Sequence, residues 1–229
     1  MGTLYLVSTP IGNLEDITNR AIKTLSSVDL IACEDTRKTG NLLKIFGTPK
    51  KELLSYYEEN ENYRIPQIIN LLLEDKNVAL VSNAGTPTVS DPGFKLVREC
   101  LRQKIKVEAI PGASAVLTGL VSSGLPTDKF LFLGYLPKKE GKKKKLLQNI
   151  KKTSKFTKAT VILFESPNRL LKSLKALQNI LGEIEITICR ELTKIHEEIR
   201  KEEISQSISH FEKNKPVGEF VILLNIPQE

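Results

Sequence analysis

This chain lacks long apolar segments. No apolar run approaches the ~18 residues that a membrane-spanning helix needs. The amino terminus, MGTLYLVSTP, has neither the basic region nor the long apolar segment of a signal peptide. We therefore expect a soluble protein that stays in the cytoplasm and does not bind a membrane.

Cysteine and histidine are both rare. The three cysteines, Cys33, Cys100 and Cys189, show no CxxC or CxH spacing, and each lies in or beside an apolar stretch, which predicts buried reduced thiols. The two histidines, His196 and His210, lie in polar segments, and we expect neither to act in catalysis or to bind a metal. The sequence therefore predicts a protein without a metal site.

Acidic residues are almost absent from one segment. Residues 138–158 contain ten lysines and a single acidic residue, Glu140, a local charge of +9 in a chain of net charge +7, so the other residues sum to −2. Such a run is either a solvated helix face or a polyanion-binding patch, and its concentration in one segment favours nucleic acid. The lysines expected to contact the nucleic acid are Lys138, Lys139, Lys142, Lys143, Lys144 and Lys145.

Strands and helices alternate along the chain, which predicts an α/β fold with a parallel sheet in its first half. The chain has 229 residues, 40% apolar and 27% charged, enough for one large domain or two small ones. A polar, proline-containing link at residues 125–130 predicts the domain boundary. The first α/β domain then spans residues 1–124, and the second, residues 125–229, contains a mixed sheet and the lysine-rich segment.

Three turns rich in glycine and proline follow expected strands in the first domain. They are TPIGN (residues 9–13), VSNAGTPTVSDPG (residues 81–93) and PGASA (residues 111–115). Because the carboxyl ends of parallel strands meet at one edge of a sheet, we expect the three turns to converge there, where such folds place ligands.

The second of these turns has the features of a ligand-binding loop. Gly85 lets a ligand approach the backbone closely, and Pro87 stiffens the turn. Asp91 and Pro92 have the types expected at the N-cap and first position of the next helix. The alternative is a well-made turn that binds nothing.

Seven short motifs follow one another along nearly the whole chain. They are LYLVSTPIGNLEDIT, EDTRKTGNLL, VSNAGTPTVSDPG, PGASAVLTGLVSSGLPTDKFLFLGYLP, ESPNRL, RELTKIHEE and GEFVILL. In this order they resemble the ribosomal small-subunit 2′-O-methyltransferase I family, a branch of the tetrapyrrole methylase superfamily. The resemblance implies two α/β domains of the class III methyltransferase type, with S-adenosylmethionine in the cleft between them, and a homodimer. It also implies 2′-O-methylation of a cytidine ribose in the decoding region of 16S rRNA, in the small ribosomal subunit.

The chain departs from the family pattern at several positions. Asn83 replaces the aspartate of the usual SDAGTP turn, which keeps a hydrogen-bond acceptor but loses a negative charge. Asn168 stands where histidine is common, and Val217 where lysine usually precedes Gly218. Many members also carry a short additional domain beyond the position of Glu229. These differences concern the way the RNA substrate is held more than they concern the fold.

The resemblance also implies cofactor-binding residues in both domains. Backbone amides and carbonyls at the turns would hold the polar groups of S-adenosylmethionine, for which glycine and other small residues leave room. The implied residues are Pro10, Ile11, Gly12, Ala84, Gly85, Thr86, Pro87, Val89, Ser114 and Ala115 in the first domain, and Ser166, Leu192 and Glu219 in the second.

Methyl transfer to a ribose hydroxyl needs two aligned reactants and a group that accepts a proton. The charged cluster Glu34, Asp35 and Arg37, after an expected strand at residues 30–33, is the favoured catalytic candidate. The alternative for this cluster is a helix cap with a surface ion pair. Further charged residues at expected strand ends are Glu165, Arg169, Arg190, Glu191 and Glu219.

Two other functions stay open. A tetrapyrrole C-methyltransferase would use the same cofactor site, but a small anionic substrate gives less reason for a lysine-rich segment. A non-catalytic RNA-binding protein would keep the lysines but needs no set of converging turns.

Overall fold

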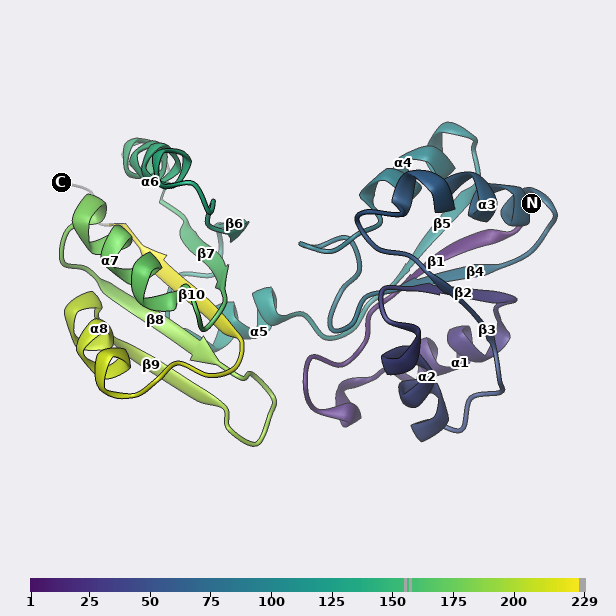
Figure 1. Cartoon of the computed structure of the whole chain (residues 1–229), viewed down its shortest axis with the longest axis horizontal. Helices are drawn as coiled ribbons and strands as arrows, with labels where there is room; N and C mark the ends of the chain where they lie inside the picture. Colours follow the sequence, from purple (N-terminus) through teal and green to yellow (C-terminus); the bar gives the residue numbers. More distant parts are fainter. Residues whose placement is uncertain (155, 157, 227–229) are drawn as a thin grey trace. The chain divides into compact units, whose positions relative to one another are not determined.

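The computed structural model describes residues 1–154, 156 and 158–226, and the chain divides into two compact units, Met1–Ser114 and Ala115–Glu229 (Figure 1). Residues 155 and 157 of the lysine-rich segment lie outside the described residues, as do residues 227–229. Within the described ranges, none of the helices is both long enough and apolar enough to cross a membrane.

The first unit is built on a five-stranded parallel sheet with the strand order β3-β2-β4-β1-β5. Its strands are β1 (Thr3–Val7), β2 (Leu30–Cys33), β3 (Glu52–Ser55), β4 (Val78–Val81) and β5 (Lys106–Ile110). Its helices are the short 3₁₀ helix η1 (Leu14–Asp16), α1 (Asn19–Ser27), α2 (Thr36–Ile45), α3 (Glu61–Leu73) and α4 (Phe94–Arg102).

Helices cover both faces of this sheet. Along β4, Val78 and Leu80 belong to an apolar cluster with residues of α3 and α4, whereas Ala79 and Val81 belong to a cluster with residues of α1 and α2. Successive side chains of a strand point to opposite faces, so a strand covered on both faces is a continuous apolar run. This is why the sequence VALV predicts a buried central strand.

The second unit is built on a mixed five-stranded sheet with the order β6-β7-β10-β8-β9, in which only β6 and β7 are parallel. Its strands are β6 (Phe130–Tyr135), β7 (Thr160–Glu165), β8 (Glu185–Arg190), β9 (Glu198–Glu203) and β10 (Phe220–Asn225). Its helices are α5 (Ala115–Ser122), α6 (Glu140–Ser154), α7 (Leu170–Leu181) and α8 (Ile204–Lys213). The predicted α/β fold with a mixed second sheet is confirmed.

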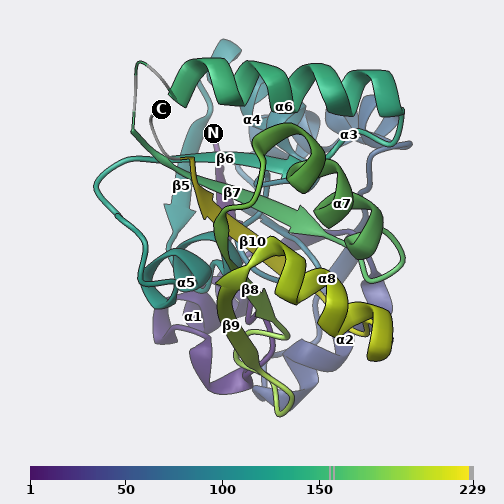
Figure 2. The ribbon, with the colours of Figure 1, turned by 90° about the vertical axis from the view of Figure 1, so that its left-hand side faces the viewer.

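Helices α6, α7 and α8 cover one face of the second sheet (Figure 2). Ile222 and Leu224 of β10 pack in the cluster that these helices form. Val221 and Leu223 point the other way, toward α5, where a methyl group added to Gly119 would lie 3.3 Å from Val221 Cγ1 and 3.6 Å from Leu223 Cδ1. The absence of a side chain at Gly119 therefore lets α5 approach the sheet closely.

The packing of α5 explains where the chain divides. The sequence predicts a boundary between residues 124 and 125, after this helix, whereas the compact units separate after Ser114, before it. Because α5 packs on β10, it belongs with the second unit. The polar link at residues 125–130 lies inside that unit and leads from α5 to β6.

All three cysteines are buried and free, as the sequence predicts. Cys33 and Cys100 lie in the two apolar clusters of the first unit, on opposite faces of its sheet, and Cys189 lies in β8 of the second. Burial raises the pKa of the Cys100 and Cys189 thiols to about 11. These thiols are neutral and inert in the folded protein.

Candidate active site

The three turns predicted to converge do meet at the carboxyl edge of the first sheet. Strands β4, β1 and β5 are neighbours, so the turns that follow them are neighbours as well. The amide of Thr9 donates to the carbonyl of Gly85 at 2.9 Å, and the amide of Gly85 donates to the carbonyl of Thr9 at 3.0 Å. The Thr86 hydroxyl donates to the carbonyl of Ala113 at 3.2 Å. Hydrogen bonds thus join the middle turn to both of the others.

Close packing around Gly85 explains why this position lacks a side chain. Its φ is +76°, a conformation that residues with a Cβ atom rarely adopt. A methyl group added there would lie 3.3 Å from Ile11 Cγ2 and 3.8 Å from the Ala113 carbonyl oxygen. A larger side chain would push the three turns apart.

The turn between β4 and α4 is strained beyond its glycines. Thr88 has a φ of +71° and Ser90 a φ of +63°, and the left-handed region is especially unfavourable for a β-branched residue such as threonine. Each such residue costs on the order of 1–3 kcal/mol, and conformations of this kind cluster at functional sites. Surrounding contacts must therefore hold the turn in place.

A buried carboxylate provides one of these contacts. Glu61, the first residue of α3, is only 5% exposed. It accepts hydrogen bonds from the Gly93 amide at 2.9 Å and the Tyr56 hydroxyl at 2.8 Å, and it forms an ion pair with Lys95 Nζ at 3.1 Å. These partners compensate for burying its charge. Sequence analysis missed this residue because Gly93 is far away along the chain.

The turns hold most of the predicted cofactor-binding residues of the first domain. Ile11, in the turn after β1, is buried, and Val89, in the turn after β4, is exposed. Ser114 is the last residue of the first unit and Ala115 the first of the second. The other predicted residues in these turns are Pro10, Gly12, Ala84, Gly85, Thr86 and Pro87.

Two residues of the favoured catalytic cluster form a helix cap. The Asp35 carboxylate accepts hydrogen bonds from the amides of Arg37 at 2.9 Å and Lys38 at 3.4 Å, and it forms an ion pair with the Arg37 guanidinium at 3.1 Å. The hydrogen bonds from Arg37 lower the pKa of Asp35 to about 2, which makes it a weak base. Asp35 and Arg37 thus have the geometry of a helix cap with a surface ion pair, which the sequence offers as the alternative to a catalytic role.

Glu34 has a different position in the sheet. Cys33 of β2 is in register with Val81 of β4, so Glu34 and Ser82 leave two neighbouring strands side by side. Glu34 is half-buried at the same edge as the turns. Its catalytic role stays a prediction.

Asp91 was missed as a candidate because the sequence favours it as a helix cap. In the structure Gly93 is the N-cap residue of α4, and the half-buried Asp91 carboxyl group interacts instead with the Ser82 hydroxyl. Burial, with a smaller contribution from the charge of Glu34, raises the pKa of Asp91 from 3.8 to about 6, and the hydrogen bond from Ser82 opposes this change. A carboxylate of this basicity can accept a proton near neutral pH. In the sequence, this role of Asp91 is indicated only by its position as an acidic residue in a turn expected at the edge of the sheet.

The second unit brings its predicted residues to one edge of its own sheet. Phe220 is in register with both Glu165 and Arg190, so the residues that flank these three positions leave the sheet at the same edge. They include Ser166, Leu192 and Glu219, the three cofactor-binding residues predicted in this domain.

Lys194 joins two segments at this edge of the second sheet. Its ammonium group lies 2.9 Å from Glu191 Oε1 and 2.8 Å from Glu219 Oε2. The amide of Glu219 also donates to Glu191 Oε1, at 2.9 Å. The turn after β8 is therefore tied to the start of β10.

Two charged residues of the ESPNRL motif have structural partners. Glu165 is 2% exposed and accepts hydrogen bonds from the Ser166 amide at 2.8 Å and the Ser173 hydroxyl at 2.5 Å. Arg169 Nε lies 3.5 Å from the Glu165 carboxylate, and the guanidinium also donates to the Leu136 carbonyl. These contacts fix the start of α7 against the end of β7 and the segment after β6.

We expect Glu165→Ala to lower the free energy of unfolding by about 3 kcal/mol or more, because it removes the buried carboxylate that pairs with Arg169 and bonds the buried Ser173. Urea-induced unfolding measures this change. A matched control is Glu212→Ala, which removes an exposed ion pair with Lys175 in the same unit and should cost less than about 1 kcal/mol. Equal losses in the two variants would contradict the structural role of Glu165.

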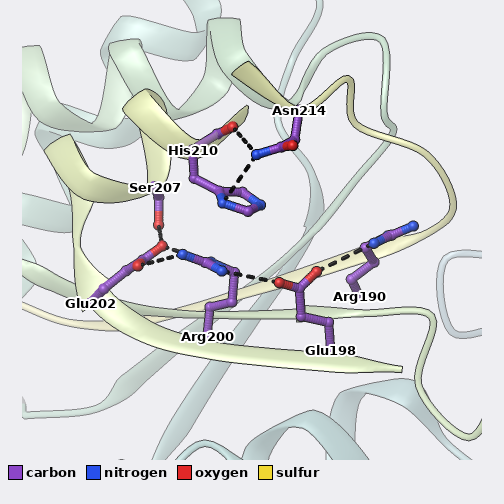
Figure 3. Close-up of polar contacts among 7 residues, drawn as sticks. All are labelled: Arg190, Glu198, Arg200, Glu202, Ser207, His210 and Asn214. Atoms are coloured by element: carbon purple, nitrogen blue, oxygen red, sulfur yellow. Dashed lines mark hydrogen bonds and ion pairs between the residues drawn. The ribbon is translucent and has the colours of Figure 1, made fainter. Parts of the chain in front are cut away.

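Arg190 belongs to a network of charges beside the edge strand β9 (Figure 3). Its guanidinium lies 3.3 Å from Glu198, which lies 3.1 Å from Arg200, which in turn lies 2.8 Å from Glu202. The hydroxyl of Ser207 in α8 donates to Glu202 at 2.8 Å. The alternating charges on this strand thus pair with one another, and charged side chains on an edge strand discourage further strands from pairing with it.

The lysine-rich segment forms helix α6, and its lysines differ in exposure. Lys143 is 4% exposed and its ammonium lies 2.9 Å from Glu140 Oε1, so it is not available to an RNA phosphate. The expectation that Lys143 contacts RNA is therefore dropped. The other five lysines predicted to contact RNA are exposed: Lys138, Lys139, Lys142, Lys144 and Lys145.

In the part of the chain that the structure describes, no group of three or more histidine, cysteine, aspartate or glutamate side chains could hold a metal ion.

Sequence comparisons agree on one family. Residues 3–207 match the model of the family described as Tetrapyrrole (Corrin/Porphyrin) Methylases. A protein of Thermotoga maritima named Ribosomal RNA small subunit methyltransferase I is 48% identical over 225 residues, 98% of this chain and 99% of the relative. Proteins of the same name from Hydrogenobaculum sp. and Synechocystis sp. are 47% and 46% identical, over 97% and 98% of this chain and 95% and 79% of their own lengths.

Solved structures show the same fold at low sequence identity. Diphthine synthase has a TM-score of 0.72 and is 15% identical, with 97% of this chain and 90% of that chain covered. Uroporphyrin-III C-methyltransferase from Thermus thermophilus, complexed with S-adenosyl homocysteine, has a TM-score of 0.65 and is 16% identical, with 97% of each chain covered.

Proposed function

We propose that this chain methylates a cytidine 2′-hydroxyl in 16S rRNA with S-adenosylmethionine. The chain belongs to the tetrapyrrole methylase family, and within that family to the ribosomal RNA small subunit methyltransferases I. The observation that carries this proposal is the meeting of three turns at the carboxyl edge of a parallel sheet, the place where such sheets bind ligands. The decoding region is the proposed location of the cytidine, as the family resemblance implies.

The residues at the turns suit this cofactor. When bound, S-adenosylmethionine supplies a methyl group activated by a sulfonium. Because Gly85 has no side chain, the three turns pack closely enough to gather their backbone at one edge of the sheet. The residues proposed to bind the cofactor in the first unit are Pro10, Ile11, Gly12, Ala84, Gly85, Thr86, Pro87, Val89 and Ser114. In the second they are Ala115, Ser166, Leu192 and Glu219.

Asp91 is the proposed proton acceptor. The acceptor hydroxyl must lose its proton as the new carbon–oxygen bond forms, and a carboxylate oxygen of Asp91 takes this proton. Glu34, on the neighbouring strand, makes Asp91 more basic through its charge. Asp35 and Arg37 shape the start of α2 beside them.

The exposed lysines of α6 and of the segment before it are the proposed contacts to RNA phosphates. They lie close together in the sequence and project from one helix and the residues leading into it. Such contacts position an RNA without reading its sequence.

Replacing Lys142, Lys144 and Lys145 together by glutamine should flatten the salt dependence of binding to small ribosomal subunits. Each neutralised phosphate adds about 0.7 to 0.9 to the slope of log K against log salt, so the loss should be about 2 to 3. Titrations at several salt concentrations measure the slope.

The control for the lysine variant makes the same change of charge elsewhere, at the exposed residues Lys104, Lys213 and Lys215. S-adenosylmethionine affinity should be unchanged in both variants. Equal salt slopes for the α6 variant and the wild type would show that these lysines are a solvated face.

We propose further that the chain acts in the cytoplasm, where 16S rRNA is assembled into subunits, and that it does so as a homodimer. Sedimentation equilibrium measures the oligomeric state, and a monomer at assay concentration would contradict the second point.

Incorporation of labelled methyl groups tests the proposed function. Small ribosomal subunits are compared as acceptors with uroporphyrinogen III and with no acceptor. We expect label only in the 16S rRNA of the first sample, and nuclease digestion should recover a 2′-O-methylcytidine. Label in the tetrapyrrole alone would identify a tetrapyrrole methyltransferase instead. The absence of label from all samples would favour a non-catalytic RNA-binding protein.

A further inference from the structure

Two large aromatic side chains are exposed at the carboxyl edge of the first sheet. Tyr63, in the first turn of α3, is 76% exposed, and Phe94, the first residue of α4, is 64% exposed. Helices that follow parallel strands begin at this edge, so both rings lie at the same end of the sheet as the three turns. Large apolar side chains exposed together are more informative than single ones.

The Glu61 carboxylate ties together the starts of the two helices that carry these rings. It accepts a hydrogen bond from Gly93 and pairs with Lys95, the two residues on either side of Phe94, and it lies two positions before Tyr63. Helices α3 and α4 also pack against each other along one face of the unit (Figure 1). The two rings thus lie at the starts of two packed helices, at the same end of the sheet.

An arginine accompanies each ring. The Arg64 guanidinium carbon lies 5.3 Å from the Tyr63 ring centroid, and its nitrogens donate to the Ser55 carbonyl at 3.1 Å and to Gln67 at 2.9 Å. The Arg98 guanidinium carbon lies 5.6 Å from the Phe94 ring centroid. We call Tyr63, Arg64, Phe94 and Arg98 the stacking patch. It combines two π surfaces with two positive charges.

This combination fits unpaired RNA. Single-stranded nucleotides bind proteins by stacking their bases on aromatic rings or arginine planes, while basic side chains hold the phosphates. A methyltransferase that acts on a ribose hydroxyl needs an accessible nucleotide. Moving that nucleotide out of the RNA base stack leaves the neighbouring bases without a stacking partner on one side. An apolar partner would cover the rings but offer no opposite charge to the two arginines.

We propose that the stacking patch binds unpaired nucleotides next to the one that is methylated, an inference that rests on the proposed function. The patch and the α6 lysines are separate contacts. The patch holds bases and the lysines hold backbone.

The test replaces both rings, in the variant Tyr63→Ala/Phe94→Ala. Stacking is worth about 5- to 150-fold in affinity for each base, so the KM for small ribosomal subunits should rise at least about tenfold. Affinity for a short oligocytidylate should fall similarly. The kcat at saturating subunits and the affinity for S-adenosylmethionine should stay within about twofold, because the rings do not act in the transition state.

Two further variants separate stacking from general effects. Tyr63→Phe/Phe94→Tyr keeps both rings and should behave as the wild type. Leu73→Ala/Leu101→Ala removes exposed apolar side chains from the opposite ends of the same two helices and should leave KM unchanged.

The outcomes distinguish this proposal from the proposed function. If the wild type transfers no methyl group to small subunits, the proposed function fails, and the oligocytidylate titration still judges the patch. If the wild type is active and the alanine pair keeps both KM and oligocytidylate affinity, the stacking patch is overturned. Dissociation of a dimer by the alanine pair, seen by sedimentation, would instead make the patch an interface between copies of the chain and would also overturn it.

Discussion

Replacing Gly85 by valine should abolish binding of S-adenosylmethionine, raising the Kd measured by calorimetry at least about 100-fold, because the substitution acts on the geometry of all three turns. Valine at a φ of +76° is strained, and its Cβ would already lie 3.3 Å from Ile11. Its branched methyl groups would extend further toward the turns that hold the cofactor. The amides and carbonyls of residues 84–87 would then be displaced or covered.

A second glycine provides the control for backbone strain. Gly47 has a φ of +63°, close to that of Gly85, but a Cβ atom added there would meet no atom within 4 Å. It follows α2, whose carboxyl end lies at the edge of the sheet away from the turns. Gly47→Val should therefore cost a similar amount of stability, about 1–3 kcal/mol, and leave cofactor affinity intact. Unchanged affinity in Gly85→Val would remove this edge of the sheet as the cofactor site.

Replacing Asp91 by asparagine should lower kcat by about 10²- to 10⁴-fold, the contribution of a positioned general base. Asparagine preserves the size of the side chain and an oxygen that Ser82 can bond, but it cannot accept the proton. S-adenosylmethionine affinity should not change, because the loss concerns an interaction of the transition state. The control is Asp75→Asn, at an exposed residue paired with the amino terminus of the chain.

The pH dependence of the wild type gives an independent measurement of the same residue. Since Asp91 must be ionised to act, kcat should rise with pH and level off above about 6. The free energy of unfolding should instead fall as pH rises. Because the pKa of Asp91 is higher in the folded protein, its proton stabilises the fold fully below pH 3.8, and this contribution is lost as pH rises through about 6. Asp91→Asn should remove both inflections. Full activity in this variant, combined with its loss in Glu34→Gln, would move the base to Glu34.

The parts of the fold that depend on local pattern could be predicted from the sequence. Apolar runs such as VALV predict buried strands, and the alternation of strands with helices predicts a sheet whose turns share one edge. The meeting of Thr9, Gly85 and Ala113 follows from this reasoning. The resemblance to a known family added the chemistry, which no periodicity contains.

The charge of α6 shows how a local pattern can mislead. A run of four lysines reads as uniformly solvated, yet Lys143 is buried. Lys143, Leu147 and Ile150 recur at helical spacing and share the face that packs on the sheet. This helical spacing is visible in the sequence, but the prediction of nucleic-acid contacts follows the lysine content of the segment and not the spacing.

Contacts between distant segments could not be predicted. Glu61 has the sequence context of an ordinary first-turn acid, and only the fold places Gly93 and Tyr56 around it. Asp91 stands where a helix cap is expected, but its side chain interacts with Ser82, and Gly93 takes the N-cap position. Side chains such as these define the candidate site, because their roles depend on packing between elements far apart in sequence.

The distribution of the buried thiols makes the protein a reporter of its own unfolding. Cys33 and Cys100 lie on opposite faces of the first sheet, whereas Cys189 belongs to the second unit. A thiol reagent reaches each of them only when the surrounding structure opens, since the neutral buried form does not react. Mass analysis of the peptides that carry the reagent then gives a separate opening rate for each face of the first unit and for the second, without an engineered probe.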